Sequence, residues 1–180
     1  MQKLKFLKPA IPLTVISVVI ALLLAIINSV TAGKILENAL IEKENAIKDI
    51  FPQCESFVSS DASLFENSVS DAGKVLDKNG SIIGYYADVS PIGFKGEISL
   101  IVGTDTNGKV VHVALLSASE TPGVGTKATD SSYLGNFVQK TSGNISDVST
   151  ITGATISSRA VRQGVLSAVT TVDAIIKGGK

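Results

Sequence analysis

The stretch Thr152-Gly153-Ala154-Thr155-Ile156-Ser157-Ser158 gathers four hydroxyl side chains around a glycine, directly before a long helical pattern. Gly153 allows backbone angles that a side chain would forbid, and Ser157 or Ser158 is well placed to cap the helix that follows. The first turn of a helix presents unpaired N–H groups and the positive end of the helix dipole, which stabilise a phosphate group without a lysine. The stretch therefore indicates phosphate chemistry, although an ordinary capped helix uses the same residue types.

The segments on either side of this stretch predict the elements that hold it. A short β-like run from 147 to 151 leads into the turn, and a helix capped by Asp130 and ending near Gly143 is expected before it. The helix after the turn continues to Ile176. Its apolar residues recur at the three-to-four spacing of a core-packed helix: Val161, Val165, Val169, Val172 and Ile176, with Leu166 and Ile175 widening the face.

Two Asn-Gly dipeptides, Asn79-Gly80 and Asn107-Gly108, predict β-hairpins with type I′ turns. The expected strands are residues 74–77, 81–88, 97–104 and 109–116. Residues 55–72 lack a clear period and are expected to form a loop with one possible short helix. The fold class is therefore α+β: a small, mostly antiparallel sheet packed with helices.

Residues 10–32 are almost wholly apolar and are long enough to cross a bilayer as one helix. Three lysines precede this segment, which by the positive-inside rule places residues 1–9 in the cytoplasm and the rest of the chain outside it. We expect a single-pass protein of the cytoplasmic (inner) membrane. The alternative is a cleaved signal peptide, because Val30-Thr31-Ala32 resembles a small-residue cleavage site, but the apolar run is longer than usual for a signal.

After the membrane segment, an amphipathic juxtamembrane helix is expected over residues 33–52, ended by Pro52. Residues 53–180 then form the extracytoplasmic domain. The sixteen basic and sixteen acidic residues balance, and no basic patch is interleaved with aromatics, so nucleic-acid binding is not predicted. Cys54 is the only cysteine, which excludes an internal disulfide and any cysteine-based metal cluster held by this chain alone.

A second informative stretch is Glu120-Thr121-Pro122-Gly123-Val124-Gly125. Proline and two glycines predict a defined loop, and spaced glycines let backbone N–H groups approach a ligand closely. Nothing in the chain resembles a complete catalytic centre for a small substrate, since it has no nucleophile elbow, metal-binding cluster or nucleotide fingerprint.

Both stretches resemble the FMN-binding domain family, which the G subunit of the Rnf complex shares with the C subunit of the sodium-pumping NADH:quinone oxidoreductase. Residues 152–157 match the family's motif Ser/Thr-Gly-Ala-Thr-x-Ser/Thr, and residues 120–125 match its Glu-Thr-Pro-Gly-(Leu/Val)-Gly segment. The resemblance implies that FMN is joined through its phosphate to Ser157, with Ser158 or Thr155 as alternative acceptors. The remaining cofactor-site residues that it implies are Thr152, Gly153, Ala154, Thr155, Ser158, Glu120, Thr121, Gly123, Val124 and Gly125.

The short chain is more similar to the Rnf G subunit than to the longer C subunit. The resemblance implies a membrane-anchored electron carrier with covalent FMN, a redox subunit of an ion-translocating ferredoxin:NAD oxidoreductase and not a stand-alone enzyme. Its expected partners are the other membrane subunits of the complex and a flavin-attaching transferase. A flavin carrier of another electron-transfer chain and a non-redox scaffold module are the alternatives.

Overall fold

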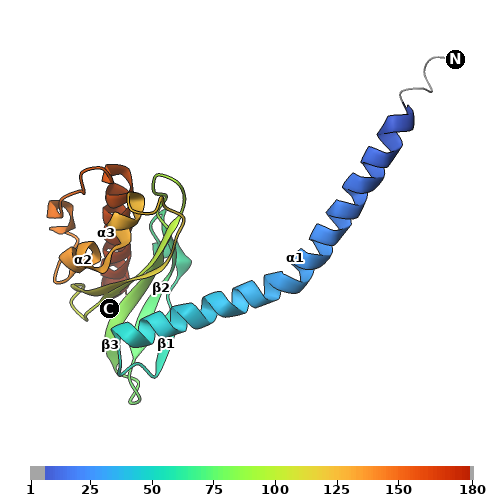
Figure 1. Cartoon of the computed structure of the whole chain (residues 1–180). Coiled ribbons are helices and arrows are strands. Elements are labelled where there is room, and N and C mark those ends of the chain that lie inside the picture. The colour runs from blue at the N-terminus through green and yellow to red at the C-terminus, as the bar shows by residue number, and fades with distance from the viewer. Residues whose placement is uncertain (1–6, 179–180) are drawn as a thin grey trace. The chain divides into compact units, whose positions relative to one another are not determined.

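A computed structural model describes residues 7–178 and divides the chain into two compact units, Met1–Glu42 and Lys43–Lys180 (Figure 1). Most of the predicted cytoplasmic segment, residues 1–6 of 1–9, lies outside the described residues. From residue 7 onward, the first unit consists of the larger part of one long helix. The second unit holds the sheet, the remaining helices and the last turns of the long helix.

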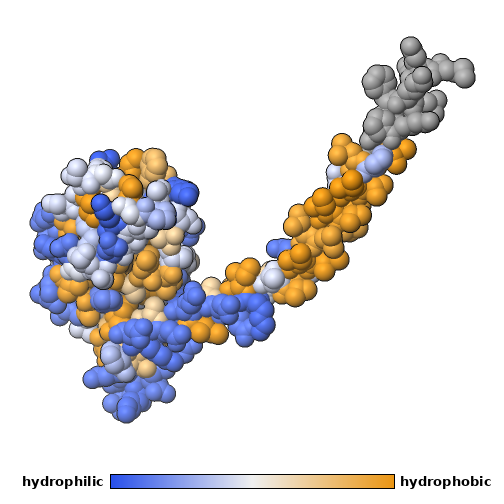
Figure 2. All heavy atoms as spheres, viewed as in Figure 1, coloured by the Kyte–Doolittle hydropathy of each residue, from blue (hydrophilic) through white to orange (hydrophobic). Residues whose placement is uncertain are grey.

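The long helix, α1, runs without interruption from Leu7 to Ile50. It contains an 18-residue window with a mean hydropathy of 2.7, long and apolar enough to cross a membrane. Figure 2 shows this part of α1 as a nearly continuous hydrophobic surface. The helix ends two residues before Pro52, because a proline disfavours helical angles in the residue that precedes it.

The sheet has five strands in the order β1-β2-β3-β4-β5, and every neighbouring pair is antiparallel. This confirms the predicted α+β fold. The strands are β1 (Ser56–Ser59), β2 (Val69–Leu76), β3 (Ile82–Val89), β4 (Ile98–Thr104) and β5 (Val110–Ala118). Strand β1 was not predicted because it is a four-residue edge strand, too short and too exposed to show a period; a 3₁₀ turn, Ala62–Leu64, follows it.

The hairpin positions are confirmed, but the predicted type I′ turns are wrong. A type I′ turn needs positive φ at both central residues, whereas only Gly80 and Gly108 have positive φ, at 76° and 79°. In the second hairpin, one Asp105 carboxylate oxygen accepts the N–H groups of Asn107 and Lys109 at 2.8 and 2.9 Å. Asp77 does the same in the first. These bonds favour a longer turn in which only the final glycine has left-handed backbone angles.

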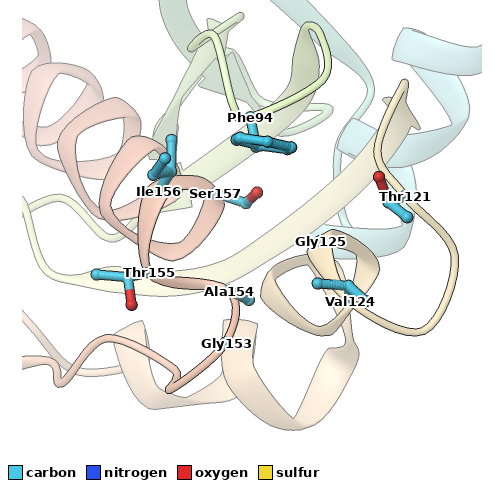
Figure 3. Close-up of a pocket in the computed structure, with 9 residues that line it drawn as sticks. All are labelled: Phe94, Thr121, Val124, Gly125, Gly153, Ala154, Thr155, Ile156 and Ser157. Atoms are coloured by element: carbon cyan, nitrogen blue, oxygen red, sulfur yellow. The ribbon is translucent and has the colours of Figure 1, made fainter.

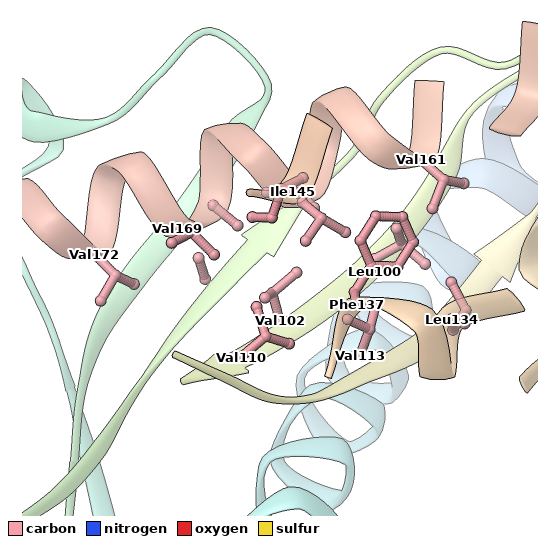
Figure 4. Packing of buried hydrophobic residues seen from close by; sticks show 14 of the residues in the cluster. Leu100, Val102, Val110, Val113, Leu134, Phe137, Ile145, Val161, Val169 and Val172 are labelled. Atoms are coloured by element: carbon pink, nitrogen blue, oxygen red, sulfur yellow. The ribbon is translucent and has the colours of Figure 1, made fainter. Parts of the chain in front are cut away.

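One face of the sheet packs against α3 (Thr155–Gly178). Figure 4 shows valines of α3 facing the side chains of β4 and β5, with residues of the intervening segment closing the end of the core. The predicted helical face is confirmed: Val161, Val165, Val169 and Val172 are fully buried, and Ile175 is 3% exposed. This packing fixes α3, and with it the turn at its start.

The opposite face of the sheet packs against the last turns of α1, which belong to the second unit. Ile47, Ile50 and Phe51 are buried there, in one cluster with Val75, Tyr86 and Ile101. Strands β3 and β4 have no room for a side chain at two positions under α1. A Cβ on Gly103 would lie 2.5 Å from a side-chain atom of Ile50, and one on Gly84 would lie 2.6 Å from a side-chain atom of Phe51.

The segment between β5 and α3 differs from its prediction. The single helix expected after Asp130 is a four-residue helix, α2 (Ser131–Leu134), followed by a 3₁₀ turn (Gly135–Phe137), and the Asp130 side chain makes no capping bond. The expected β-like run near 147–151 is also wrong: a 3₁₀ turn (Ile145–Asp147) leads into irregular chain. Val148 in this run is buried in the core without pairing to a strand, so its apolar character reflects packing.

Candidate functional site

A cavity of about 440 Å³ opens where the chain enters α3. Segments far apart in the sequence form it: the 121–125 loop, the 153–157 turn and a loop before β4. Figure 3 shows how these segments surround the space. Its lining residues are Phe94, Thr121, Val124, Gly125, Gly153, Ala154, Thr155, Ile156 and Ser157.

Residues 153–157, which line one side of the cavity, comprise a tight turn and the first residues of α3 (Thr155–Gly178). Gly153 has φ +85°, the left-handed conformation that disfavours any residue with a Cβ. Helix α3 begins at Thr155, so the prediction that Ser157 or Ser158 caps it is wrong, because both serines lie inside the helix. The first N–H groups of a helix have no partner within the helix, and residues of the first turn of α3 line the cavity.

Ser158 holds the turn together. Its buried hydroxyl accepts the Ile151 N–H at 3.0 Å and donates to the Ala154 carbonyl at 2.8 Å. Tyr133 adds a bond from its hydroxyl to the Ser158 carbonyl at 3.2 Å. Burial raises the pKa of Tyr133, so the phenol stays protonated as this donor. The Ser158 hydroxyl is therefore used in hydrogen bonds that stabilise the turn.

The other two hydroxyls near the helix start differ from Ser158. Thr155 directs its hydroxyl to the Ile151 carbonyl, at 3.4 Å, and in Figure 3 it points away from the cavity. Ser157 is 1% exposed, yet within the described part of the chain its hydroxyl makes no hydrogen bond. Figure 3 shows this hydroxyl directed into the space below Phe94. Of the three, only the Ser157 oxygen is both unengaged and open to the cavity.

The 121–125 loop forms the facing wall. The Val124 N–H donates to the Thr121 carbonyl at 3.2 Å across Pro122-Gly123, and Gly123 has φ +74°, as in a type II turn. The Gly123 N–H donates to the Thr126 hydroxyl at 2.9 Å, which closes the loop. The predicted loop therefore places Thr121, Val124 and Gly125 at the cavity.

Seven of the sequence-predicted residues line the cavity, and four do not. The four are Thr152 and Gly123, which are exposed, and Ser158 and Glu120, which are buried. Two lining residues were missed, Phe94 and Ile156, which are 70% and 54% exposed. A signal for Phe94 was present, because an aromatic residue at the tip of a glycine-flanked loop, Gly93 to Gly96, has no core to enter.

The segments that form the cavity lie in a part of the chain that is similar to known proteins. The FMN-binding domain family matches residues 93–170, a span that contains all three wall segments. A protein of Methanosarcina acetivorans named as the G subunit of an ion-translocating oxidoreductase complex is 31% identical over 93% of this chain and 94% of its own length. The chain belongs to this G-subunit family.

Two further members support the assignment. The G subunit of the Na⁺-translocating ferredoxin:NAD⁺ oxidoreductase complex of Acetobacterium woodii is 30% identical over 85% of this chain and 84% of its own length. The G subunit of the proton-translocating ferredoxin:NAD⁺ oxidoreductase complex of Clostridium ljungdahlii is 36% identical over 57% of this chain and 60% of its own.

The residues present in this G-subunit chain fit FMN. A volume of about 440 Å³ is within the range of small-molecule sites. Apolar surface for a ring system comes from Phe94, Val124 and Ile156. The cavity is not filled by side chains at Gly125, Gly153 and Ala154, because these residues are small. The unengaged Ser157 hydroxyl and the first turn of α3 supply a place for the phosphate.

Proposed function

We propose that this chain is the membrane-anchored electron-transfer subunit of an Rnf-type ion-translocating ferredoxin:NAD oxidoreductase, with FMN attached covalently to Ser157. The names of the G-subunit relatives support the complex and its reaction. They also support other membrane subunits of the same complex as partners. On this view the chain is a redox subunit and has no substrate of its own.

The observation that carries the attachment site is the state of the three hydroxyls. Ser158 is held by hydrogen bonds inside the turn, and Thr155 points away from the cavity. Ser157 alone presents a free oxygen to a cavity of suitable size. Ser157 lines the cavity, and Figure 3 shows its hydroxyl on the cavity side, so on this proposal the hydroxyl is reached from there.

The chain's residues then have separate roles. Ser157 tethers the phosphate, and the unpaired N–H groups and the dipole at the start of α3 stabilise its negative charge. Phe94 and the 121–125 loop border the ring and limit its contact with water. Bound FMN supplies the electron-carrying chemistry, whose potential such contacts tune.

The anchor is proposed to be a single span within α1, with the sheet domain on the extracytoplasmic side. The apolar part of α1 supports a membrane span, and the lysines before it support a cytoplasmic amino terminus. The apolar run is longer than the usual apolar region of a signal peptide, which supports an uncleaved anchor.

The test is an intact-mass measurement of the full chain co-expressed with a flavin-attaching transferase, after denaturation to remove non-covalent ligand. We expect the wild-type chain to gain the mass of one FMN less one water, since a phosphoester has that composition, and peptide mapping should place it on the peptide that contains Ser157. Ser157→Ala should remove this mass completely. Ser157→Thr, the matched control, should retain it because a hydroxyl remains at the same position.

Thr155→Ala is the second control and should be modified like the wild type. FMN retained in Ser157→Ala would move the attachment to another hydroxyl. An unmodified wild-type mass, despite modification of a positive-control protein by the same transferase, would refute covalent attachment and leave the scaffold alternative.

A further inference from the structure

Glu120 is buried between two loops that line the cavity, one carrying Phe94 and the other carrying Val124. It is 6% exposed, although it is a charged residue type. One carboxylate oxygen, Oε1, accepts the Lys95 N–H at 3.4 Å. The other, Oε2, is buried without a hydrogen-bond partner in the described part of the chain. No ion pair with a cation compensates the group among residues 7–178.

The backbone is shaped to admit this carboxylate. A Cβ on Gly93 would collide with Oε1, and a Cβ on Gly125 would collide with Oε2. The side chain therefore fills the narrow space between one loop at Gly93 and Lys95 and the other at Gly125. Phe94 and Val124, the rim residues that these loops carry, lie next to these contact points.

The position of Phe94 depends on contacts to the backbone of its loop, such as those made by Glu120. Its side chain is 70% exposed, so packing against the core does not hold it over the cavity. Its position depends on the backbone of its loop, which is closed at the base by the Ile92–Glu97 bridge and by the Gly93 N–H bond to the Gly96 carbonyl at 2.8 Å. Below the tip, Glu120 is the buried side chain that reaches this backbone from the facing loop.

A buried carboxylate with an unpaired oxygen opposes folding, because its desolvation is only partly offset by hydrogen bonds. We propose that Glu120 is a positioning residue: it spaces the Phe94 loop from the 121–125 loop and so holds the Phe94 ring over the cavity. The inference rests on the proposed flavin function only for the consequence, which is an apolar cover on one side of the bound ring.

The first test needs no flavin. Hydrogen exchange is measured on the full chain in detergent, produced without the transferase, for wild type, Glu120→Ala and Glu120→Gln. We expect Glu120→Ala to speed exchange in residues 91–97 about tenfold, because the space and the Lys95 bond are both lost. Exchange in β2 and β3 should not change.

Glu120→Gln is the matched control, since glutamine keeps the volume and one acceptor oxygen. It should leave exchange in residues 91–97 near the wild-type rate. An exchange rate in Glu120→Ala equal to that of the wild type would overturn the proposal. Equal acceleration in both variants would also overturn it, because the charge of Glu120 and not the space that its side chain fills would then hold the loop.

The second test uses the flavinylated chain and the midpoint potential of its FMN. Loss of an apolar cover should raise the potential, because water then stabilises the added negative charge. Glu120→Ala and Phe94→Ala should shift it in the same direction, and the double variant should shift it no further than the larger single one. Additive shifts would show that Glu120 acts on the flavin directly and overturn the positioning role.

The intact mass of each sample separates this inference from the proposed function. If the wild type carries no FMN, covalent attachment fails, whereas hydrogen exchange in the unloaded chain still decides whether Glu120 holds the loop.

Discussion

At the scale of single residues, neighbouring hydroxyls at the start of α3 have different environments. Ser158 and Ser157 are adjacent and both buried, but one oxygen is bonded to Ile151 and Ala154 and the other is free. The residue types alone do not distinguish them, and the motif resemblance names Ser157 but leaves Ser158 as an alternative, because the helix register decides which hydroxyl meets the turn and which meets the cavity.

Ser158→Ala should destabilise the fold by about 1–3 kcal/mol, because the part-buried Ile151 N–H loses its partner. Ser157→Ala should change the unfolding free energy much less, since its hydroxyl makes no bond. Denaturant unfolding of the unloaded full chain in detergent checks both variants. Equal stability losses would contradict the assignment of the two hydroxyls.

Gly153→Ala should cost about 1–2 kcal/mol, because φ +85° is left-handed while no neighbouring atom obstructs a Cβ. Gly135→Ala is the control: it has helical angles (φ −59°) and equal space. That variant should be neutral or slightly more stable, as a glycine-to-alanine change at compatible angles reduces the entropy of the unfolded chain. Thermal unfolding of the two variants side by side measures the difference, and a loss in Gly135→Ala as large as that in Gly153→Ala would argue against backbone strain.

At the scale of elements, a polar cluster holds the end of α1 on the sheet. Lys43 contacts Asp71 at 2.6 Å and Asp88 at 3.3 Å, and these two carboxylates are cross-strand partners on β2 and β3. Tyr86 donates a further bond to Asp71 at 2.9 Å. Burial raises the pKa of Tyr86, so its phenol remains a donor. The lysine therefore neutralises two acids that would otherwise repel each other.

Lys43→Met should lower the unfolding free energy by about 1–3 kcal/mol, between the values for exposed and buried ion pairs, since the Lys43 side chain is 12% exposed. Lys34→Met is the matched control, because its partner Glu37 and its own side chain are both exposed and its loss should cost little. Denaturant unfolding at neutral pH compares them, and similar losses in both would refute the role of the cluster.

The same cluster predicts a dependence on pH. Burial opposes ionisation of Asp71, but hydrogen bonds from Lys43 and Tyr86 outweigh it and hold the pKa of Asp71 below its ordinary value of 3.8. A lowered pKa stabilises the fold above 3.8, and this contribution is lost as the pH falls through the folded-state value. The unfolding free energy of the wild type should therefore fall in this acid range, and that of Lys43→Met should fall less. Parallel acid profiles would contradict the assignment.

At the scale of the whole molecule, the proposed topology is tested by cysteine labelling of intact cells. In a Cys54→Ser background, Asn79→Cys at the exposed tip of the first hairpin should react with a membrane-impermeant maleimide. Gln2→Cys should react only after the membrane is permeabilised. Labelling with the opposite preference would place the domain in the cytoplasm and exclude the proposed orientation.

The sequence by itself determined the features that depend on local pattern. The apolar run of α1, the 3.6-residue period of α3 and the glycine-ended hairpins each report burial or backbone angle within a few residues, so the antiparallel α+β fold was predictable. Strand β1 and the irregular chain before α3 were not, because their structure depends on partners distant in sequence.

The tertiary structure decided how the residues that the sequence pointed to are arranged around one cavity, and which further residues join them. It brought the 121–125 loop to the start of α3, placed the Ser157 hydroxyl rather than that of Ser158 or Thr155 toward the cavity, and added Phe94 from a third segment. It also set Glu120 behind the wall instead of inside the cavity. The physical reason is that side-chain direction at a site follows from how helix and sheet pack, and composition or spacing does not record it.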